Sequence, residues 1–241
     1  MKTLKLGLLL LLCGGVTMSS FSQSNVYSMN IVGYINRLLS PGNNLIANQL
    51  IASPNNSINN VLLGVADGAT FTKWDASANT FLPLSVFSLS SQTWSINYSL
   101  NLGEGALLNS PSFTTNTFVG SVANYTNVLD LGPGGQPWSP NYADGLHLIA
   151  CPSPIAGPVS TMFDKVTGRP AQAGESVSFL DEASQTYITA TFDGAGWDND
   201  PTLNVAHAAW FNLGPVNVPE PSSMALAGLA FGTLLAVRRR H

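Results

Sequence analysis

The sequence has 241 residues, of which 45% are hydrophobic and only 9% are charged, and its formal net charge is −4. This length is enough for one sizeable hydrophobic core or two small ones. Five of the nine basic residues lie near the two ends of the chain, which leaves four to face thirteen acids. Four scattered cations cannot neutralise a run of phosphates, so we expect no nucleic acid and no anionic lipid surface as partners of the folded part.

Residues 1–22 have the pattern of a secretory signal peptide. Two lysines precede an apolar run over 6–16, and Ser20 and Ser22 provide the small residues that signal peptidase requires. We therefore expect signal peptidase to cleave after residue 22 and the remaining chain to be exported.

Cys151 is the one cysteine left after that cleavage, because Cys13 lies in the signal peptide. A single cysteine cannot form an intramolecular disulfide, so core burial has to hold the exported chain together. We expect Cys151 to be a small buried hydrophobic side chain. A link between two chains and a nucleophilic role are the alternatives.

The two halves of the chain share a series of similar segments in the same order. One of them, GATFTKWDASANTF, aligns without a gap on GESVSFLDEASQTY. Named by their first residues, the matching segments are Gly42 with Gly145, Gly68 with Gly174, Trp94 with Trp197, and Ile31 with Phe118. This pattern predicts a duplication, with related units over 23–117 and 118–217. Two copies are too few for a solenoid.

Both units consist of short apolar, aromatic or β-branched runs, such as NLIANQL, ATFTKWD and NTFLPLSVF, bounded by glycine, proline, asparagine and serine. Helical periodicity is ambiguous in two places only, near 58–63 and in AGPVSTMFDKV. We expect an all-β fold in which two β-rich repeats form a sandwich or a barrel-like body. The segment LGPGGQPWSP over 131–140 has no counterpart in the first unit, which indicates an inserted loop.

No local catalytic, phosphate-binding or metal-binding motif occurs in the sequence. We therefore expect no catalytic residue, no metal and no cofactor. His147 and His207 leave open a secreted hydrolase whose site assembles from distant residues. Asp193, Asp198 and Asp200 could offer oxygen ligands to Ca²⁺, but their neighbours are typical of turns, and we expect turns.

The five tryptophans suggest a second alternative. Trp94 and Trp197 recur at matching positions, which favours a role in core packing. Trp138 lies in the inserted loop, where an exposed aromatic ring could stack on a sugar. A carbohydrate-binding module that acts on exopolysaccharide is therefore an alternative function, and it depends on exposed tryptophans.

Residues 222–237 contain no charge and precede Arg238, Arg239 and Arg240. A helix of this length spans about 24 Å, against about 30 Å of membrane hydrocarbon, so we expect a marginal single transmembrane helix. The arginines form a basic anchor that should stay in the cytoplasm, which puts the body of the protein outside.

The segment over 218–241 combines Val218, Pro219, Glu220 and Pro221 with an apolar stretch and a final arginine cluster. It resembles the PEP-CTERM sorting signal of exported bacterial proteins. The resemblance implies a temporary membrane anchor recognised by an exosortase, a membrane cysteine protease that cuts near the PEP motif. It also implies a Gram-negative cell that makes extracellular polysaccharide. The body is similar to duplicated β-rich exported proteins of unknown activity, through its GYIN, NLIANQL and GEG elements.

These patterns together predict an exported, noncatalytic cell-surface or extracellular-matrix protein. We expect it to be anchored transiently in the membrane and sorted by an exosortase, with signal peptidase as its other processing enzyme. The carbohydrate-binding module and the secreted hydrolase are the alternatives.

Overall fold

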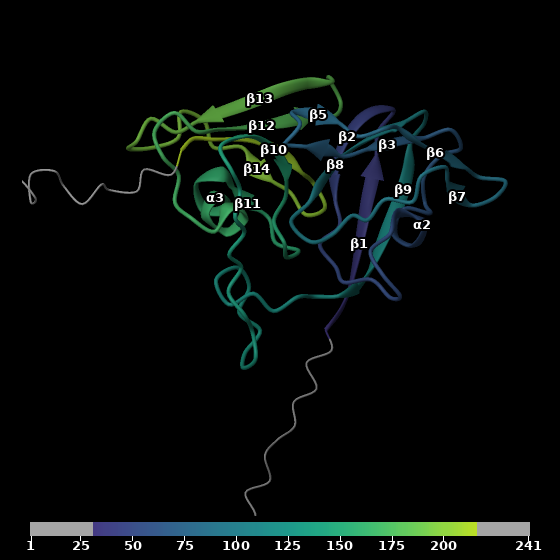
Figure 1. Ribbon diagram of the computed structural model, residues 1–241, viewed down its shortest axis with the longest axis horizontal. Helices are drawn as coiled ribbons and strands as arrows, with labels where there is room; N and C mark the ends of the chain where they lie inside the picture. The colour runs from purple at the N-terminus through teal and green to yellow at the C-terminus, as the bar shows by residue number, and fades with distance from the viewer. Residues whose placement is uncertain (1–30, 216–241) are drawn as a thin grey trace, which may run out of the picture.

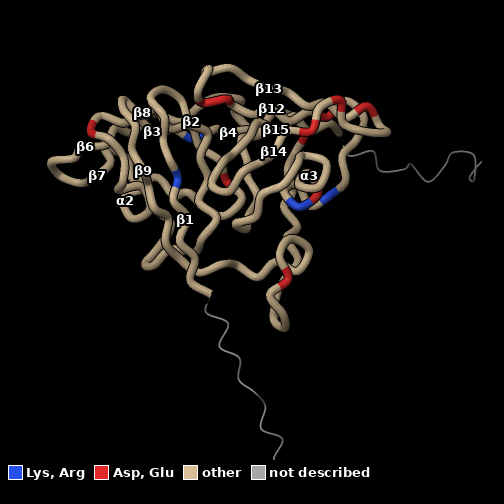
Figure 2. The backbone as a smooth tube through the Cα atoms, turned by 180° about the vertical axis from the view of Figure 1, so that it is seen from behind, with Lys and Arg blue, Asp and Glu red and all other residues tan. Residues whose placement is uncertain are grey.

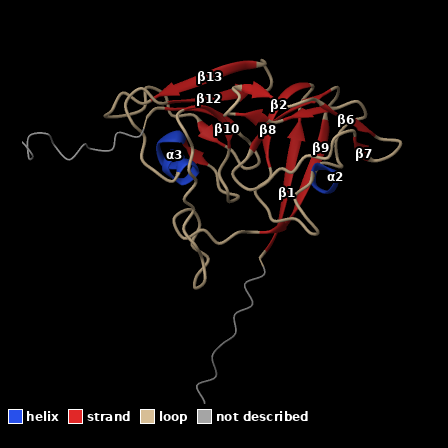
Figure 3. Cartoon of the chain, in the orientation of Figure 1, coloured by secondary structure: helices blue, strands red, loops and turns tan. Residues whose placement is uncertain are grey.

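The computed structural model describes residues 31–215, which form a body built mostly of β-strands (Figure 1, Figure 3). The expected all-β class is confirmed at this level. The predicted signal peptide over 1–22 and membrane helix over 222–237 lie outside the described residues. Between residues 31 and 215, no helix is long and apolar enough to cross a membrane.

The first half of the body contains a five-stranded antiparallel sheet in the order β2-β8-β3-β6-β7. Its strands are β2 (Gly42–Ala47), β8 (Gly105–Ser110), β3 (Thr70–Thr72), β6 (Ser85–Ser88) and β7 (Thr93–Trp94). A hairpin of β4 (Trp74–Asp75) and β5 (Thr80–Phe81) follows β3. The short helix α2 (Ile58–Val61) contacts β7 and β9 (Thr114–Ser121).

The second half contains a four-stranded antiparallel sheet in the order β10-β15-β12-β13. Its strands are β10 (Gly145–Ile149), β15 (Ala209–Leu213), β12 (Ser176–Asp181) and β13 (Thr186–Thr191). A two-stranded ribbon of β11 (Gly157–Pro158) and β14 (Thr202–Leu203) lies against helix α3 (Val159–Thr167). In Figure 1 the two sheets lie side by side, with α3 below the second one.

Helix α3 explains why the sequence was ambiguous in this region. Its buried residues Val159, Met162, Phe163 and Val166 follow the three-and-four spacing of an amphipathic helix, but the pattern lasts for only two turns. Gly168 ends the helix in the left-handed conformation, with φ 74°, which glycine adopts without steric cost.

β1 (Val32–Leu39) and β9 form a ribbon, in which they pair antiparallel along their whole length and pack against the first core, and the chain runs from β9 into the second half. The predicted unit boundary between residues 117 and 118 falls inside β9. Each half has its own hydrophobic core, around Phe71 in the first and around Phe211 in the second. A third cluster joins them, and its buried members are Leu45, Ala47, Leu148, Ala150 and Ala208.

The segments that match in sequence lie on corresponding strands of the two sheets. β2 corresponds to β10, β8 to β15, and β5 to the start of β13, while β3 and β4 together correspond to β12. The halves differ where Pro83 follows β5. In the second half β12 and β13 pair without interruption, from Ser176 with Thr191 to Asp181 with Thr186.

The first half has one extra residue between β5 and β6, so the pairing shifts from Trp74 with Phe81 to Phe71 with Ser85. Pro83 lies in this bulge and has no N–H to donate to a ladder. The run NTFLPLSVF, expected as one strand, is therefore two.

The contacts between the halves are reciprocal. The N–H of Ala47 donates to the carbonyl of Ala206 at 3.1 Å, and the N–H of Ala150 donates to the carbonyl of Gly103 at 3.0 Å. By the alignment, Ala150 corresponds to Ala47 and Gly103 corresponds to Ala206, so exchanging the halves exchanges the two bonds. The β-bridges of Ile46 with His207 and of Ile149 with Glu104 are related in the same way.

Gly105 and Ala208 also correspond, and they meet each other at this junction. A Cβ added at Gly105 would lie 2.6 Å from the Cβ of Ala208, so the two backbones could not approach this closely with a side chain on both. Corresponding residues contact each other in this way next to a two-fold axis. The duplication itself stays a prediction.

Charged side chains are few, and most of the cations are paired. Three of the four cations in residues 31–215 form ion pairs, namely Arg37 with Glu182, Lys73 with Glu104, and Arg169 with Glu175. Figure 2 shows acids on the loops at both ends of β12 and β13.

Candidate functional site

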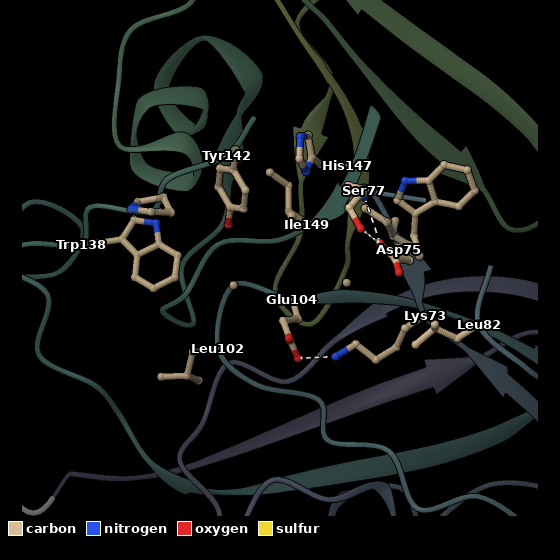
Figure 4. A pocket seen from close by; sticks show the side chains of 16 residues that line it. Lys73, Asp75, Ser77, Leu82, Leu102, Glu104, Trp138, Tyr142, His147 and Ile149 are labelled. Carbon is tan, nitrogen blue, oxygen red and sulfur yellow. Dashed lines mark hydrogen bonds and ion pairs between the residues drawn. The ribbon is translucent and has the colours of Figure 1, made fainter. Parts of the chain in front are cut away.

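A cavity of about 570 Å³ lies where the two halves meet (Figure 4). Its lining residues come from β4 and the residue before it, from the loop that leads into β8, from β10, and from the segment that includes the inserted loop. The volume falls in the range of about 300–1,000 Å³ that is usual for small-molecule sites. We call this cavity the larger cavity.

A lysine and a glutamate form one side of the larger cavity. The ammonium group of Lys73 donates to Glu104 Oε2 at 2.8 Å and to the carbonyl of Ser99 at 3.0 Å. Glu104 also accepts the backbone N–H of Asn101 at 2.7 Å. These bonds fix both side chains, and the pairing neutralises the lysine charge. Figure 4 shows the bond between Lys73 and Glu104.

Asp75 lies beside them and stabilises the turn between β4 and β5. Its Oδ1 accepts the hydroxyl of Ser77 at 2.6 Å and the backbone N–H groups of Ser77 and Ala78. The Ser77 hydroxyl, followed by the Ala78 N–H, lowers the pKa of Asp75. The carboxylate therefore stays ionised and forms the turn between β4 and β5.

Trp138 forms the opposite wall of the cavity. Its indole N–H donates to the carbonyl of Val166 at 2.9 Å, and its backbone is held by Asn127, which both accepts its N–H and donates to its carbonyl. The ring approaches Gly103 so closely that a Cβ there would lie 2.7 Å from it. Gly103 also has φ 78°, so glycine is required at this position on two grounds.

Tyr142 and His147 complete the aromatic side. Figure 4 shows the Tyr142 hydroxyl directed toward the cavity on the side of Glu104, and no residue in 31–215 forms a hydrogen bond with it. Burial, followed by the negative charge of Glu104, raises the pKa of Tyr142, so its hydroxyl keeps its proton as a donor. The His147 ring packs against Tyr142, and its Nε2 is hydrogen-bonded to the carbonyl of Ala143 at 2.7 Å.

A second cavity of about 210 Å³, the smaller cavity, is lined by the corresponding segments of the other half. It includes Leu45, Glu182 and His207, which correspond to Leu148, Ala76 and Glu104 of the larger cavity. Here Glu182 forms a buried ion pair with Arg37.

The electrostatics of the smaller cavity reflect this burial. Burial, followed by the positive charge of Arg37, lowers the pKa of His207 to about 4, so this imidazole is neutral at pH 7. Burial also raises the pKa of Glu182, and the nearby Arg37 counteracts only part of that effect.

The structure tests several of the residues singled out in the sequence. Trp94 is buried in the first core as expected, and Trp197 is partly buried against the second core. Trp138 is also partly buried, and it lines the larger cavity. Cys151 is buried as expected, and burial raises the pKa of its thiol to about 11.

The three aspartates serve in loops, as expected. Asp193 accepts the N–H groups of Ala195 and Gly196, Asp198 accepts that of Thr191, and Asp200 accepts both the N–H and the hydroxyl of Ser160. Within residues 31–215, no group of three potential metal ligands comes together. The sorting residues Val218, Pro219, Glu220 and Pro221, and Arg238, Arg239 and Arg240, lie outside the described residues.

Sequence reasoning missed the larger cavity because its parts are far apart in the chain. Lys73 and Tyr142 carry no local motif, and only the packing of the two halves brings them to one cavity. One signal was available: the inserted loop over 131–140 occurs in one unit only, and it supplies Trp138.

Comparison with known proteins identifies one segment. Residues 217–240 match the family described as the PEP-CTERM protein-sorting motif. No curated protein and no solved structure matches the chain significantly. The predicted resemblance is confirmed, and the motif implies export, anchoring through this region and processing by an exosortase. The chain carries a PEP-CTERM protein-sorting motif over residues 217–240.

Proposed function

We propose that this protein is a noncatalytic component of the cell surface or extracellular matrix. A signal peptide over 1–22 exports it, a helix over 222–237 anchors it transiently, and an exosortase recognises Val218, Pro219, Glu220 and Pro221. The observation that carries the proposal is the match of residues 217–240 to the sorting motif.

The fold next to the motif supports this proposal. Strand β15 ends at Leu213, and the N–H of Gly214 donates to the buried Glu175 carboxylate at 2.9 Å. Glu175 is held in turn by Arg169. The ordered core therefore extends to within three residues of the sorting motif. A cut near the motif would remove the anchor without removing any strand of the body.

The surroundings of the histidines favour a noncatalytic body over a hydrolase. His147 is hydrogen-bonded to the carbonyl of Ala143, and His207 Nδ1 to the carbonyl of Val205. Cys151, which carries the free thiol of residues 31–215, is buried and protonated at pH 7. A general base needs a nucleophile within hydrogen-bond reach, and no hydroxyl or thiol of residues 31–215 forms a hydrogen bond with either imidazole.

The reciprocal contacts support a further part of the proposal, namely that the body arose by duplication. A unit that formed a symmetric homodimer buries the same patch on both copies. The paired bonds of Ala47 and Ala150, and the meeting of Gly105 with Ala208, are what fusion of such a dimer would leave behind.

Processing can be tested in the producing cells by mass spectrometry of the surface protein's C-terminus. We expect the wild-type chain to lack residues 225–241 when the exosortase is present, and to keep them in an exosortase deletion. A variant with Pro219→Ala, Glu220→Ala and Pro221→Ala should also keep them. Pro215→Ala, which lies just outside the motif, is the matched control and should be processed normally. Surface protein that keeps residues 225–241 in cells with a working exosortase would overturn the proposal.

A further inference from the structure

The two cavities can be compared position by position, because corresponding segments line them. The packing residues at the junction are the same or similar: Leu45 and Ala47 in one half correspond to Leu148 and Ala150 in the other, and all four are buried. Several polar lining residues differ. Lys73 corresponds to Phe179 and Glu104 to His207. The junction has kept its packing while the chemistry of the two cavities has changed.

The change makes one cavity smaller than the other. In the smaller cavity Glu182 lies in the lining together with His207, and it forms an ion pair with Arg37. At the position of Glu182 the larger cavity has Ala76, a side chain too short to fill the corresponding space. The cavities accordingly differ in volume, at about 570 Å³ and about 210 Å³.

The inserted loop forms one wall of the larger cavity. The first half has no corresponding loop, so the smaller cavity lacks this wall. The loop supplies Trp138 and Pro140, and Tyr142 follows two residues later. The wall is rigid, because Asn127 and the carbonyl of Val166 hold Trp138 by three hydrogen bonds of 2.6–2.9 Å. A preorganised aromatic side chain of this kind lowers the entropy cost of binding a ligand.

We propose that the larger cavity binds a neutral saccharide unit between Trp138 and the pair of Lys73 and Glu104. An aromatic ring offers the flat apolar surface on which the C–H face of a pyranose packs. The Tyr142 hydroxyl has no partner in residues 31–215 and can donate to a sugar oxygen, while Glu104 can accept from a sugar hydroxyl.

The charge of the cavity selects against acidic sugars. Glu104 neutralises Lys73, and Asp75 adds a second carboxylate that its turn keeps ionised. No cation of the described lining is left to pair with a uronate. The inference deepens the proposed function, since a surface protein would meet saccharides through this cavity.

Binding can be measured by saturation-transfer NMR and calorimetry on the full chain. The protein should be kept in a zwitterionic detergent without a sugar headgroup, so that the detergent cannot compete. The ligands are cellotriose, mannotriose and triacetylchitotriose, with trigalacturonate as the acidic comparison. We expect at least one neutral trisaccharide to bind with a Kd below about 1 mM, and trigalacturonate to bind at least tenfold more weakly.

Two variants locate the site. Tyr142→Phe removes only the hydroxyl and should weaken binding about tenfold, as expected for one lost hydrogen bond. Trp138→Phe should weaken it several-fold, because the stacking area shrinks. Tyr187→Phe, a half-exposed tyrosine outside the cavity, is the matched control and should leave Kd unchanged. Thermal unfolding of each variant verifies that it is folded.

The proposal is overturned if no neutral trisaccharide binds at about 10 mM, if trigalacturonate binds best, or if Tyr142→Phe and Trp138→Phe bind as the wild type does. Because purified protein is used, this result is independent of sorting. A chain that binds sugar but keeps residues 225–241 in cells would leave this inference standing and contradict only the sorting proposal.

Discussion

The two cavities at the junction occupy corresponding places, yet one is much larger than the other. In the smaller cavity Glu182, which forms an ion pair with Arg37, takes up part of the space. In the larger cavity Ala76 leaves that space free, and the inserted loop adds Trp138. One junction can therefore support both arrangements, because the packing residues Leu45 and Leu148 are the same in the two cavities while several of the polar residues around them differ.

The two ion pairs should also differ in how much the stability of the fold depends on them. An ion pair removed from water is stable only while both partners are present, since each desolvated charge depends on the other. An ion pair that stays partly hydrated depends much less on its partner. Mutations and pH changes at the smaller cavity should therefore change the unfolding free energy strongly, and those at the larger cavity should change it little.

The largest effect is expected for Glu182→Ala. This change leaves Arg37 charged and buried, with its side chain 5% exposed, and its Nε already has no hydrogen-bond partner. Loss of one partner of a buried pair costs about 3–5 kcal/mol, so we expect the unfolding free energy to fall by about 3 kcal/mol in urea denaturation.

The matched control is Lys73→Met in the larger cavity, where the paired side chains are 18% and 37% exposed. It should cost less than about 1 kcal/mol. The double variant Arg37→Met with Glu182→Ala should recover most of the loss, because no unpaired charge remains. Equal losses for Glu182→Ala and Lys73→Met would refute the distinction between the cavities.

A somewhat smaller effect should appear with pH. The folded pKa of His207, about 4, lies below its ordinary value of 6.5, so the unfolded chain takes up the proton first as the pH falls. The stability that depends on neutral His207 is fully present above pH 6.5 and is lost as the pH falls toward 4. We expect a loss of about 2–3 kcal/mol over this window, measured by urea denaturation at several pH values.

The variant His207→Gln should remove this part of the pH dependence, because glutamine does not titrate. His147→Gln, on the side of the larger cavity, should leave it in place. If the unfolding free energies of the wild type and of His207→Gln depend on pH in the same way across this window, His207 is not desolvated as described.

The smallest effect concerns the place where the halves touch. Gly105→Ala brings a Cβ to within 2.6 Å of the Cβ of Ala208, and overpacking of this kind costs about 1–3 kcal/mol. Adding Ala208→Gly should restore part of the stability, because the corresponding residues then exchange roles. A double-mutant cycle from urea denaturation measures this coupling.

Gly196→Ala is the control for this cycle, since nothing lies within 4 Å of its added Cβ. It should change the unfolding free energy by less than about 0.5 kcal/mol. Additive effects of Gly105→Ala and Ala208→Gly would show that the two residues do not meet across the junction.

Much of the fold was predictable because β-structure leaves a local pattern. The short runs between turn residues became strands, and the apolar residues Leu45 to Ala47 of β2 and Leu148 and Ile149 of β10 are buried. Two features escaped. Helix α3 was too short for its period to stand out, and the bulge at Pro83 divided a run that was expected as one strand.

The candidate site was less predictable, for a reason that its residues make clear. In the sequence, Trp138 is a tryptophan of the inserted loop, and Glu104 is the acid of the GEG element. Neither points to a cavity by itself, because a cavity depends on which surfaces meet. The approach of Trp138 to Gly103, and of Tyr142 toward Glu104, depends on the contact between the halves.

The sequence by itself determined the all-β class and the sorting motif. Both depend on order along the chain: short apolar and β-branched runs between turn residues make strands, and a PEP motif next to an apolar stretch and arginines can be recognised in an extended chain. Only the tertiary structure decided that two corresponding cavities flank the junction, and that one is much larger than the other. Such differences depend on side-chain volume, charge and burial among residues far apart in sequence, and these quantities exist only once the halves have packed together.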